Sequence, residues 1–103
     1  MSEGKKFDQG KIPYELIPPA ALEEVAKVLA MGRDKYTAWN WSNGIAYTRL
    51  IGAILRHTFA YLGGQSKDEE SGLSHIAHVA VNCLFILHFE KYKPELDDRK
   101  KHE

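Results

Sequence analysis

The sequence has only one cysteine, Cys83, and no excess of charge of either sign. A single cysteine excludes a disulfide within the chain, and it stands in an apolar run, where a free cysteine behaves as a small hydrophobic residue. Lys plus Arg and Asp plus Glu are equal at 14 each. Since duplex-binding proteins of this size usually carry a basic excess, we expect no nucleic-acid partner.

A long hydrophobic run is also missing. The longest apolar stretch lies between His75 and His88, where His78 and Asn82 interrupt it, and it is too short to span a bilayer. The segment 1–10 is polar and does not resemble a signal peptide. The length of 103 residues and the 44% hydrophobic content are typical of one globular domain. We therefore expect a cytoplasmic protein with no membrane partner.

Convincing strand patterns are absent as well, so the expected fold class is all-α. Residues 1–17 carry the turn signals of an extended arm, and Pro18-Pro19 fits the start of a helix, where proline is tolerated. Apolar residues recur with a helical period over 20–31, and Gly32 is the expected C-terminal cap. The loop 33–44 holds both tryptophans and is expected to contain a short helical turn.

Two further helices are expected. The second begins at Thr48, a suitable N-cap, and runs to about Leu62, where two glycines end it. The third extends from about Leu73 to Tyr92, shortly before Pro94. The tail 94–103 is charged and is expected to be frayed. The predicted organisation is a single domain over 1–103, with three main helices between the arm and the tail.

The third helix is apolar around nearly its whole circumference, which is typical of a buried helix. Its polar exceptions His75, His78 and Asn82 are spaced i, i+3 and i+7 and therefore line one stripe. Burying these groups unpaired costs about 1–3 kcal/mol each. The stripe therefore faces a metal or ligand cleft, a structural network with Arg56 and His57, or an internal water chain.

The second helix offers polar residues that its core packing does not require. Arg49, Ala53 and Arg56 share one face, and His57 and Tyr61 share an adjoining face, while apolar positions elsewhere suffice for packing. Arg56 either contacts a ligand or points to solvent or a carboxylate.

An acidic loop lies just before the third helix. Asp68 and Glu70 offer the hard oxygen ligands that suit Mg²⁺ or Mn²⁺, which carboxylates, waters and substrate phosphates hold together. The alternative is that these charges are solvated and that Asp68, Ser71 or Ser74 caps the third helix.

Two segments upstream have the composition of phosphate or base contacts. The basic segment 4–11, which ends at Lys11, lacks the spacing of a P-loop. Lys35-Tyr36 and Asn40-Trp41 combine a cation with an aromatic face for stacking on a base and an amide for reading base edges. Tryptophans in small domains also serve as core or interface anchors, so both roles stay open for Trp41.

Together these segments resemble one family, the phage proteins described as dATP/dGTP diphosphohydrolase N-terminal domains, which are similar to MazG-type pyrophosphohydrolases. The resemblance covers about residues 4–90. It rests on Lys6-Phe7-Asp8-Gln9-Gly10-Lys11, Leu16-Ile17-Pro18-Pro19, Gly32 with Lys35-Tyr36, Asn40-Trp41 with Gly44, Arg56-His57, Asp68 with Glu70-Ser71-Gly72, and His75, His78 and Asn82.

The resemblance implies an all-α, MazG-like fold, a divalent metal (Mg²⁺ or Mn²⁺) and a homo-oligomer. It also implies hydrolysis of purine (deoxy)nucleoside triphosphates of the dATP or dGTP type to monophosphate and pyrophosphate, in phage nucleotide metabolism in the host cytoplasm. The sequence departs from MazG-like enzymes in one respect. Their Glu-x-x-Glu and Glu-x-x-Asp motifs are matched only by Glu95 and Asp98, in the tail, whereas His75 and His78 stand where the second motif is expected. Histidine is a poor ligand for Mg²⁺ but suits Mn²⁺ or a transition metal.

The leading hypothesis is a metal-dependent pyrophosphohydrolase. The expected metal ligands are Asp68, Glu70, His75 and His78, and the expected catalytic groups are Glu70, His75, His78 and His57, the last as general base or water-positioning residue. The expected substrate contacts are Lys11, Lys35 and Arg56 on the phosphates, Asn40 and Trp41 on the base, and Asn82.

Two rival hypotheses remain at this stage. The missing carboxylate motifs favour a non-catalytic nucleotide-binding protein, such as a scavenger of a signalling nucleotide. A helical interaction module with a purely structural polar stripe is the other. In all three cases we expect a homo-oligomer, a dimer or tetramer of helical bundles, because two partner helices cannot cover the apolar third helix.

Overall fold

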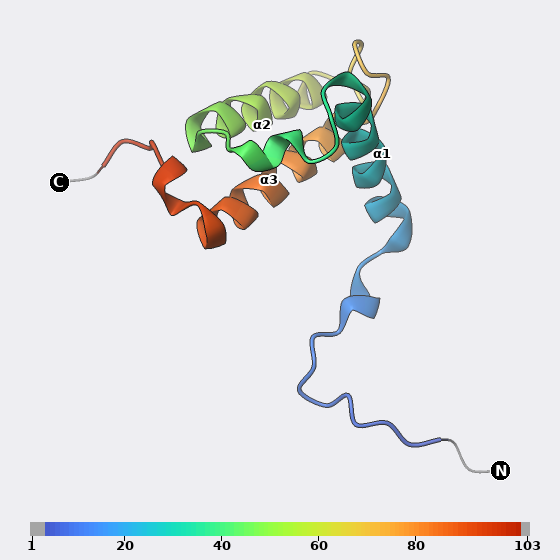
Figure 1. Ribbon diagram of the computed structural model, residues 1–103. Helices are drawn as coiled ribbons and strands as arrows, with labels where there is room; N and C mark the ends of the chain where they lie inside the picture. Colours follow the sequence, from blue (N-terminus) through green and yellow to red (C-terminus); the bar gives the residue numbers. More distant parts are fainter. Residues whose placement is uncertain (1–3, 102–103) are drawn as a thin grey trace.

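The computed structural model describes residues 4–101. This part of the chain folds into three α-helices and three short 3-10 turns, joined by loops. The helices are α1 (Pro19–Lys35), α2 (Tyr47–Leu62) and α3 (His75–Tyr92), and the 3-10 turns are η1 (Tyr14–Leu16), η2 (Asn40–Asn43) and η3 (Pro94–Leu96) (Figure 1). No β-strand occurs in this part of the chain, apart from one isolated bridge between Lys67 and Ser74. The all-α prediction is confirmed, as is the helical turn in the loop 33–44.

Helix α1 begins at the predicted proline pair but continues one turn beyond its predicted end. Gly32 lies inside the helix, and its carbonyl accepts the N–H of Tyr36 at 2.9 Å, so the prediction that Gly32 is the C-terminal cap is wrong. A helical glycine costs about 1 kcal/mol relative to alanine, which the packing of α1 overrides. The additional turn carries Lys35 to the polar hollow described below.

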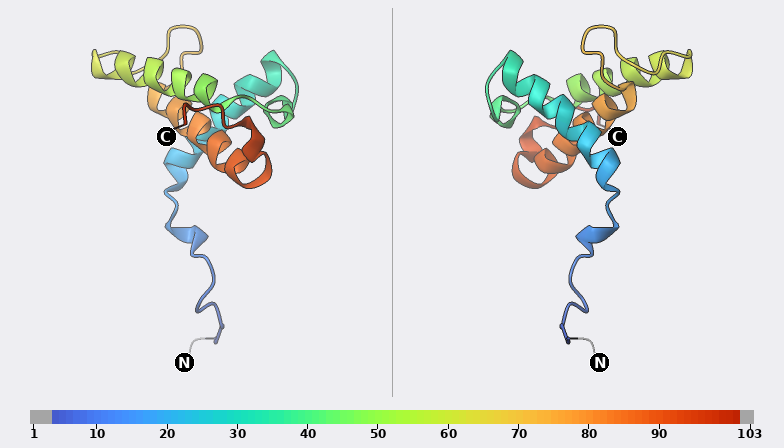
Figure 2. Two further views of the ribbon diagram at one scale, coloured as in Figure 1. Left: turned by 90° about the vertical axis from the view of Figure 1, so that its left-hand side faces the viewer. Right: turned by 90° about the vertical axis from the view of Figure 1, so that its right-hand side faces the viewer.

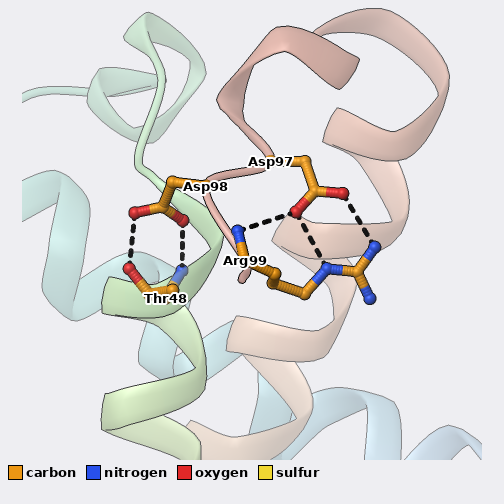
Figure 3. A network of polar contacts seen from close by, with 4 residues as sticks. All are labelled: Thr48, Asp97, Asp98 and Arg99. Carbon is orange, nitrogen blue, oxygen red and sulfur yellow. Dashed lines mark hydrogen bonds and ion pairs between the residues drawn. The ribbon is translucent and has the colours of Figure 1, made fainter. Parts of the chain in front are cut away.

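The N-terminus of α2 is capped by the C-terminal tail. Ala46 occupies the N-cap position, and the Asp98 carboxylate accepts the backbone N–H of Thr48 at 2.9 Å and its hydroxyl at 2.6 Å (Figure 3). The prediction that Thr48 itself is the N-cap is therefore wrong. Its side chain cooperates with a carboxylate from far along the chain, which no local pattern reveals.

The tail is held against the helices as far as Arg99, so the prediction that it is frayed is wrong for that part. Leu96 packs beside Tyr47 and Phe89, and Asp97 accepts two hydrogen bonds from the Arg99 guanidinium at 2.7 and 2.8 Å (Figure 3). The same guanidinium lies 5.9 Å from the centre of the Tyr47 ring. Residues 1–3 of the arm and 102–103 of the tail lie outside the described residues.

Helix α3 is the central element, and both of the other helices pack against it (Figure 1). Ser74 caps it by accepting the N–H of Ile76 at 3.1 Å, one of the alternatives left open by the sequence. The hydrophobic core has two clusters along α3: Val28 of α1 with Ala77 and Val81, and Tyr47 and Leu50 of α2 with Phe89. This packing holds the first turns of α3 between α1 and α2.

The arm leaves the helical body and projects away from it (Figure 2). The radius of gyration is 17.4 Å, whereas a compact domain of this length has a value of roughly 13 Å.

No helix within residues 4–101 is long and apolar enough to cross a membrane.

Candidate functional site

A polar hollow opens where the end of α1, the middle of α2 and the start of α3 meet. Its volume is about 320 Å³, and Met31, Lys35, His57, Asp68, Glu70, Ser71 and His78 line it. Most of these side chains are ionisable, although the surrounding helices are packed through apolar residues. Of the polar stripe of α3, His78 lines this hollow, while His75 lies against the His57 ring and Asn82 lines a second hollow.

Three side chains in and beside this hollow lie close enough together to be able to hold a metal ion, and we call them the metal-binding group. His57, Asp68 and His75 each offer one ligand atom, and these atoms all lie within 4.8 Å of one another. The Nδ1 atoms of His57 and His75 lie 2.8 Å apart, so at least one of them carries no proton. Two imidazoles and one carboxylate form a donor set that suits a transition-metal ion and leaves coordination positions open.

His75 is oriented by a chain of hydrogen bonds on its far side. The side-chain amide N–H of Gln65 donates to the Glu69 carboxylate at 3.2 Å. This bond directs the side-chain carbonyl oxygen of Gln65 toward His75, and that oxygen lies 2.7 Å from His75 Nε2. His75 Nε2–H therefore donates to Gln65, and Nδ1 is left as a lone pair facing His57. Metal-ligating histidines usually make such a bond to a carbonyl or carboxylate, which fixes the tautomer and the ring.

The loop before α3 is closed by backbone hydrogen bonds around Asp68. The N–H of Asp68 donates to the Leu73 carbonyl at 2.8 Å, and the N–H of Gly72 donates to the Asp68 carbonyl at 2.8 Å. The Asp68 carboxylate in turn accepts the N–H of Ser71 at 2.9 Å. Burial opposes ionisation of Asp68, but the hydrogen bonds from Ser71 outweigh it and hold its pKa below the ordinary value. Asp68 is thus a fixed, charged donor.

His78 packs against the metal-binding group without belonging to it. Its ring stacks on that of His57, with the ring centres 4.4 Å apart and the planes within 5°, and its Nε2 lies 2.8 Å from the Ser71 hydroxyl. Burial lowers the pKa of both His57 and His78, and the neighbouring histidines lower the pKa of His57 further. Both rings are therefore neutral at pH 7, the form in which imidazole binds a metal or accepts a proton.

Comparison with known proteins identifies the family of this chain. The family described as "dATP/dGTP diphosphohydrolase, N-terminal" matches residues 1–99. The chain belongs to this family. A relative, the dATP/dGTP diphosphohydrolase of Salmonella phage PMBT28, is 44% identical over 97 residues, which is 94% of this chain but 33% of the relative. The chain thus spans about a third of that protein's length. No solved structure matches.

In this member of the family, the structure brings together some of the predicted metal ligands but not all. Asp68 and His75 lie in one group with His57, for which the sequence predicts a role as general base or water-positioning residue. Glu70 and His78 line the same hollow outside that group. The Glu70 carboxylate lies 3.3 Å from Lys35 Nζ and its side chain is 82% exposed.

Three of the predicted substrate contacts line one of two hollows, and the other three line neither. Lys35 lines the polar hollow, whereas Arg56 and Asn82 line a second hollow beside it. Lys11 is exposed on the projecting arm, and Asn40 and Trp41 line neither of these hollows. Trp41 instead stacks on Phe85, with ring centres 4.7 Å apart, and packs against the core around Phe89.

Sequence reasoning assigned no site role to three residues: Gln65, which is hydrogen-bonded to His75, Ser71, which lines the first hollow, and Arg49, which lines the second. Gln65 and Ser71 give no recognisable signal, because polar residues in a loop are usually solvated. Arg49 shares a helical face with Arg56 in the sequence, and that spacing is the signal for its place in the second hollow. Tyr36, whose ring the sequence analysis names for stacking on a base, follows Lys35 at the end of α1 and also lines the second hollow.

Proposed function

We propose that this chain hydrolyses purine deoxynucleoside triphosphates, of the dATP and dGTP type, to monophosphate and pyrophosphate with the help of a divalent metal. The observation that carries the proposal is the group of His57, Asp68 and His75, which lies at a hollow in a chain of the dATP/dGTP diphosphohydrolase family. A phosphoryl-transfer enzyme needs a cation at the reacting phosphate and positioned groups around it, because positioning and charge stabilisation provide most of the catalysis.

The donor set favours Mn²⁺ or another transition metal over Mg²⁺. Mg²⁺ prefers oxygen ligands and retains several waters, whereas His57 and His75 offer nitrogen and only Asp68 offers oxygen. Both histidine side chains are partly or fully buried, and the Gln65 bond already orients His75. Such preorganisation favours one coordination geometry.

A divalent cation bound there would neutralise charge on the phosphate oxygens and activate a water molecule. Around it, Lys35 lies beside the hollow and is placed to exchange its exposed partner, Glu70, for a substrate phosphate. His78 is the neutral imidazole that lines the hollow outside the metal-binding group, and we assign it the proton released by the attacking water. The water oxygen bonds to phosphorus, the bond between the α-phosphoryl group and pyrophosphate breaks, and pyrophosphate leaves with the electron pair.

A second candidate is a nucleotide-binding protein without turnover. One observation favours it: the metal-binding group contains a single carboxylate, where MazG-like enzymes use four. In that case the same side chains hold a nucleotide–metal complex but do not activate water.

One experiment separates these functions. The protein is incubated with dATP, dGTP, the ribonucleotides and cyclic dinucleotides, first with Mg²⁺ and then with Mn²⁺, and the products are resolved by chromatography. We expect monophosphate and pyrophosphate from purine deoxynucleotides with Mn²⁺, and no turnover by His75→Ala. Tight retention of unchanged nucleotide supports the binding protein, and neither turnover nor retention contradicts both candidates.

A further inference from the structure

The second hollow lies between α2 and α3 and is larger than the first, at about 490 Å³. Its polar lining consists mainly of Arg49, Arg56, Asn82 and Tyr36. The two arginines are seven residues apart, two turns of α2, and therefore project from the same face. A concave surface with two guanidinium groups has the chemistry of an anion site.

The charge of these arginines is not neutralised within the described part of the chain. The ion pairs between residues 4 and 101 involve Lys27, Arg33, Lys35 and Arg99, but neither Arg49 nor Arg56. No carboxylate lines the second hollow. Two positive charges thus face one concavity of a chain whose formal net charge is zero.

Gly52 gives the Arg56 side chain its room. The guanidinium folds back over α2, so that a Cβ added at Gly52 lies 3.2 Å from Arg56 Nη1. Glycine in the interior of a helix is unfavourable relative to alanine, and at this position its lack of a side chain keeps the floor of the hollow open. The sequence pattern of α2 thus accommodates the guanidinium between its turns.

The two hollows adjoin one another through neighbouring residues. Arg56 lines the second hollow and the next residue, His57, lines the first. Likewise, Lys35 lines the first hollow and the next residue, Tyr36, lines the second. On α3, His78 faces the first hollow and Asn82, one turn later, the second, with the Asn82 amide donating to the His78 carbonyl at 2.8 Å. A polyphosphate chain held at the metal-binding group therefore has a basic surface beside it.

We propose that the hollow of Arg49 and Arg56 binds the pyrophosphate half of the substrate, the β- and γ-phosphates that become the leaving group. This inference rests on the proposed function. Pyrophosphate carries more negative charge than the monophosphate product, and planar guanidinium groups bind its oxygens in bidentate fashion. The two arginines thus neutralise charge on the leaving group, at a site separate from the metal-binding group, and make pyrophosphate the product that binds more tightly.

The test is calorimetric titration of pyrophosphate and of dGMP, without added metal, into the full chain and the Arg49→Ala/Arg56→Ala double variant. We expect the affinity for pyrophosphate to fall by at least about tenfold, since one charge-assisted hydrogen bond exceeds that ratio, and the affinity for dGMP by less than about threefold. Arg33→Ala, which removes an arginine already paired with Asp34, is the matched control and leaves both affinities unchanged.

A second variant, Gly52→Leu, keeps both arginines and fills the hollow with a good helix former. It should lose pyrophosphate affinity while its helical circular dichroism is retained. Unchanged pyrophosphate binding in both variants, equal losses for dGMP, or no binding of pyrophosphate by the unmodified chain overturns this inference, whether or not the protein hydrolyses nucleotides. Arginine-dependent pyrophosphate binding without any hydrolysis supports the anion site and contradicts the proposed enzyme.

Discussion

Asp68 and Glu70 are two residues apart in one loop, yet their carboxylates have different surroundings. Asp68 is partly buried, accepts the N–H of Ser71 and lies within 4.8 Å of the ligand atoms of two histidines. Glu70 is exposed and pairs with Lys35. A carboxylate that is fixed and desolvated contributes more to a metal site than one that moves in water.

We therefore expect Asp68→Asn and Glu70→Gln to differ. Asp68→Asn keeps an oxygen that accepts the Ser71 bond but removes the charge, and it should raise the Mn²⁺ concentration for half-maximal activity or binding by about tenfold or more, as changes around metal sites do. Glu70→Gln should change it by less than about twofold. Equal shifts for both variants would show that Glu70 is also a ligand.

For Trp41 the sequence leaves base stacking and packing open, and the structure shows it packed against other aromatic rings. It stacks on Phe85 and meets His88 edge-on at 4.9 Å between ring centres. We expect Trp41→Ala to lower the free energy of unfolding by about 3 kcal/mol, near the low end for large aromatic residues because the side chain is only half-buried. Urea denaturation followed by circular dichroism measures this loss.

Trp39→Ala is the matched control, since Trp39 is 72% exposed in the same loop, and a loss below about 1 kcal/mol is expected. Nucleotide and pyrophosphate affinities should fall equally in Trp41→Ala. A selective loss of nucleotide affinity with unchanged stability would instead support stacking of Trp41 on the base.

At the scale of the elements, the start of α2 depends on the end of the chain. The Asp98 carboxylate satisfies a free N–H of the first turn, as N-cap side chains do, and its negative charge interacts favourably with the helix N-terminus. The hydrogen bonds from Thr48 hold the pKa of Asp98 below its ordinary value, and those from Arg99 lower the pKa of Asp97 to about 2. The tail is therefore part of the fold of α2.

The pH dependence of stability follows from these shifts. Both carboxyl groups have a lower pKa folded than unfolded, so their contribution is fully present above about pH 4 and is lost as the pH falls through the folded values. Asp98→Asn should lower the thermal midpoint at pH 7 and make stability less sensitive to pH between about 4 and 2. Glu23→Gln, exposed on α1, should keep the pH dependence of the unmodified chain; identical acid profiles for both variants would exclude the role of Asp98.

At the scale of the whole molecule, a large apolar surface is left uncovered in the single chain. Ile76, Cys83, Leu84 and Leu87 share one exposed face of α3, and Phe59 on α2 is 64% exposed. Such a contiguous patch usually marks an interface. Since α1 and α2 cover other sides of α3, we propose that a second copy of the chain covers this face.

We predict that light scattering coupled to size exclusion gives a multiple of the 11.7 kDa chain mass. Leu87→Glu, which places a charge on a 62% exposed position of that face, should dissociate the oligomer. Glu23→Lys on α1 is the surface control. Phe85 does not serve for this test, because it packs in both core clusters and its replacement unfolds the monomer as well. A stable monomer of the unmodified chain contradicts the prediction.

The sequence by itself determined the helices and the polar stripe of α3. Helical periodicity, prolines and paired glycines are local signals, so the all-α class and the approximate bounds of three helices followed from them. The spacing of His75, His78 and Asn82 placed them on one face, because a helix fixes which residues share a side. The family resemblance likewise rested on residues that can be read in order along the chain.

Only the tertiary structure decided which side chains meet. The partners of His75 are His57, from another helix, and Gln65, from a loop; Asp98 caps a helix that starts 51 residues earlier, at Tyr47. Trp41 turned toward Phe85 rather than toward the hollows. These contacts depend on how α1 and α2 pack against α3, and nonlocal packing leaves no periodic trace in a single sequence, because the residues involved are separated by segments of arbitrary length.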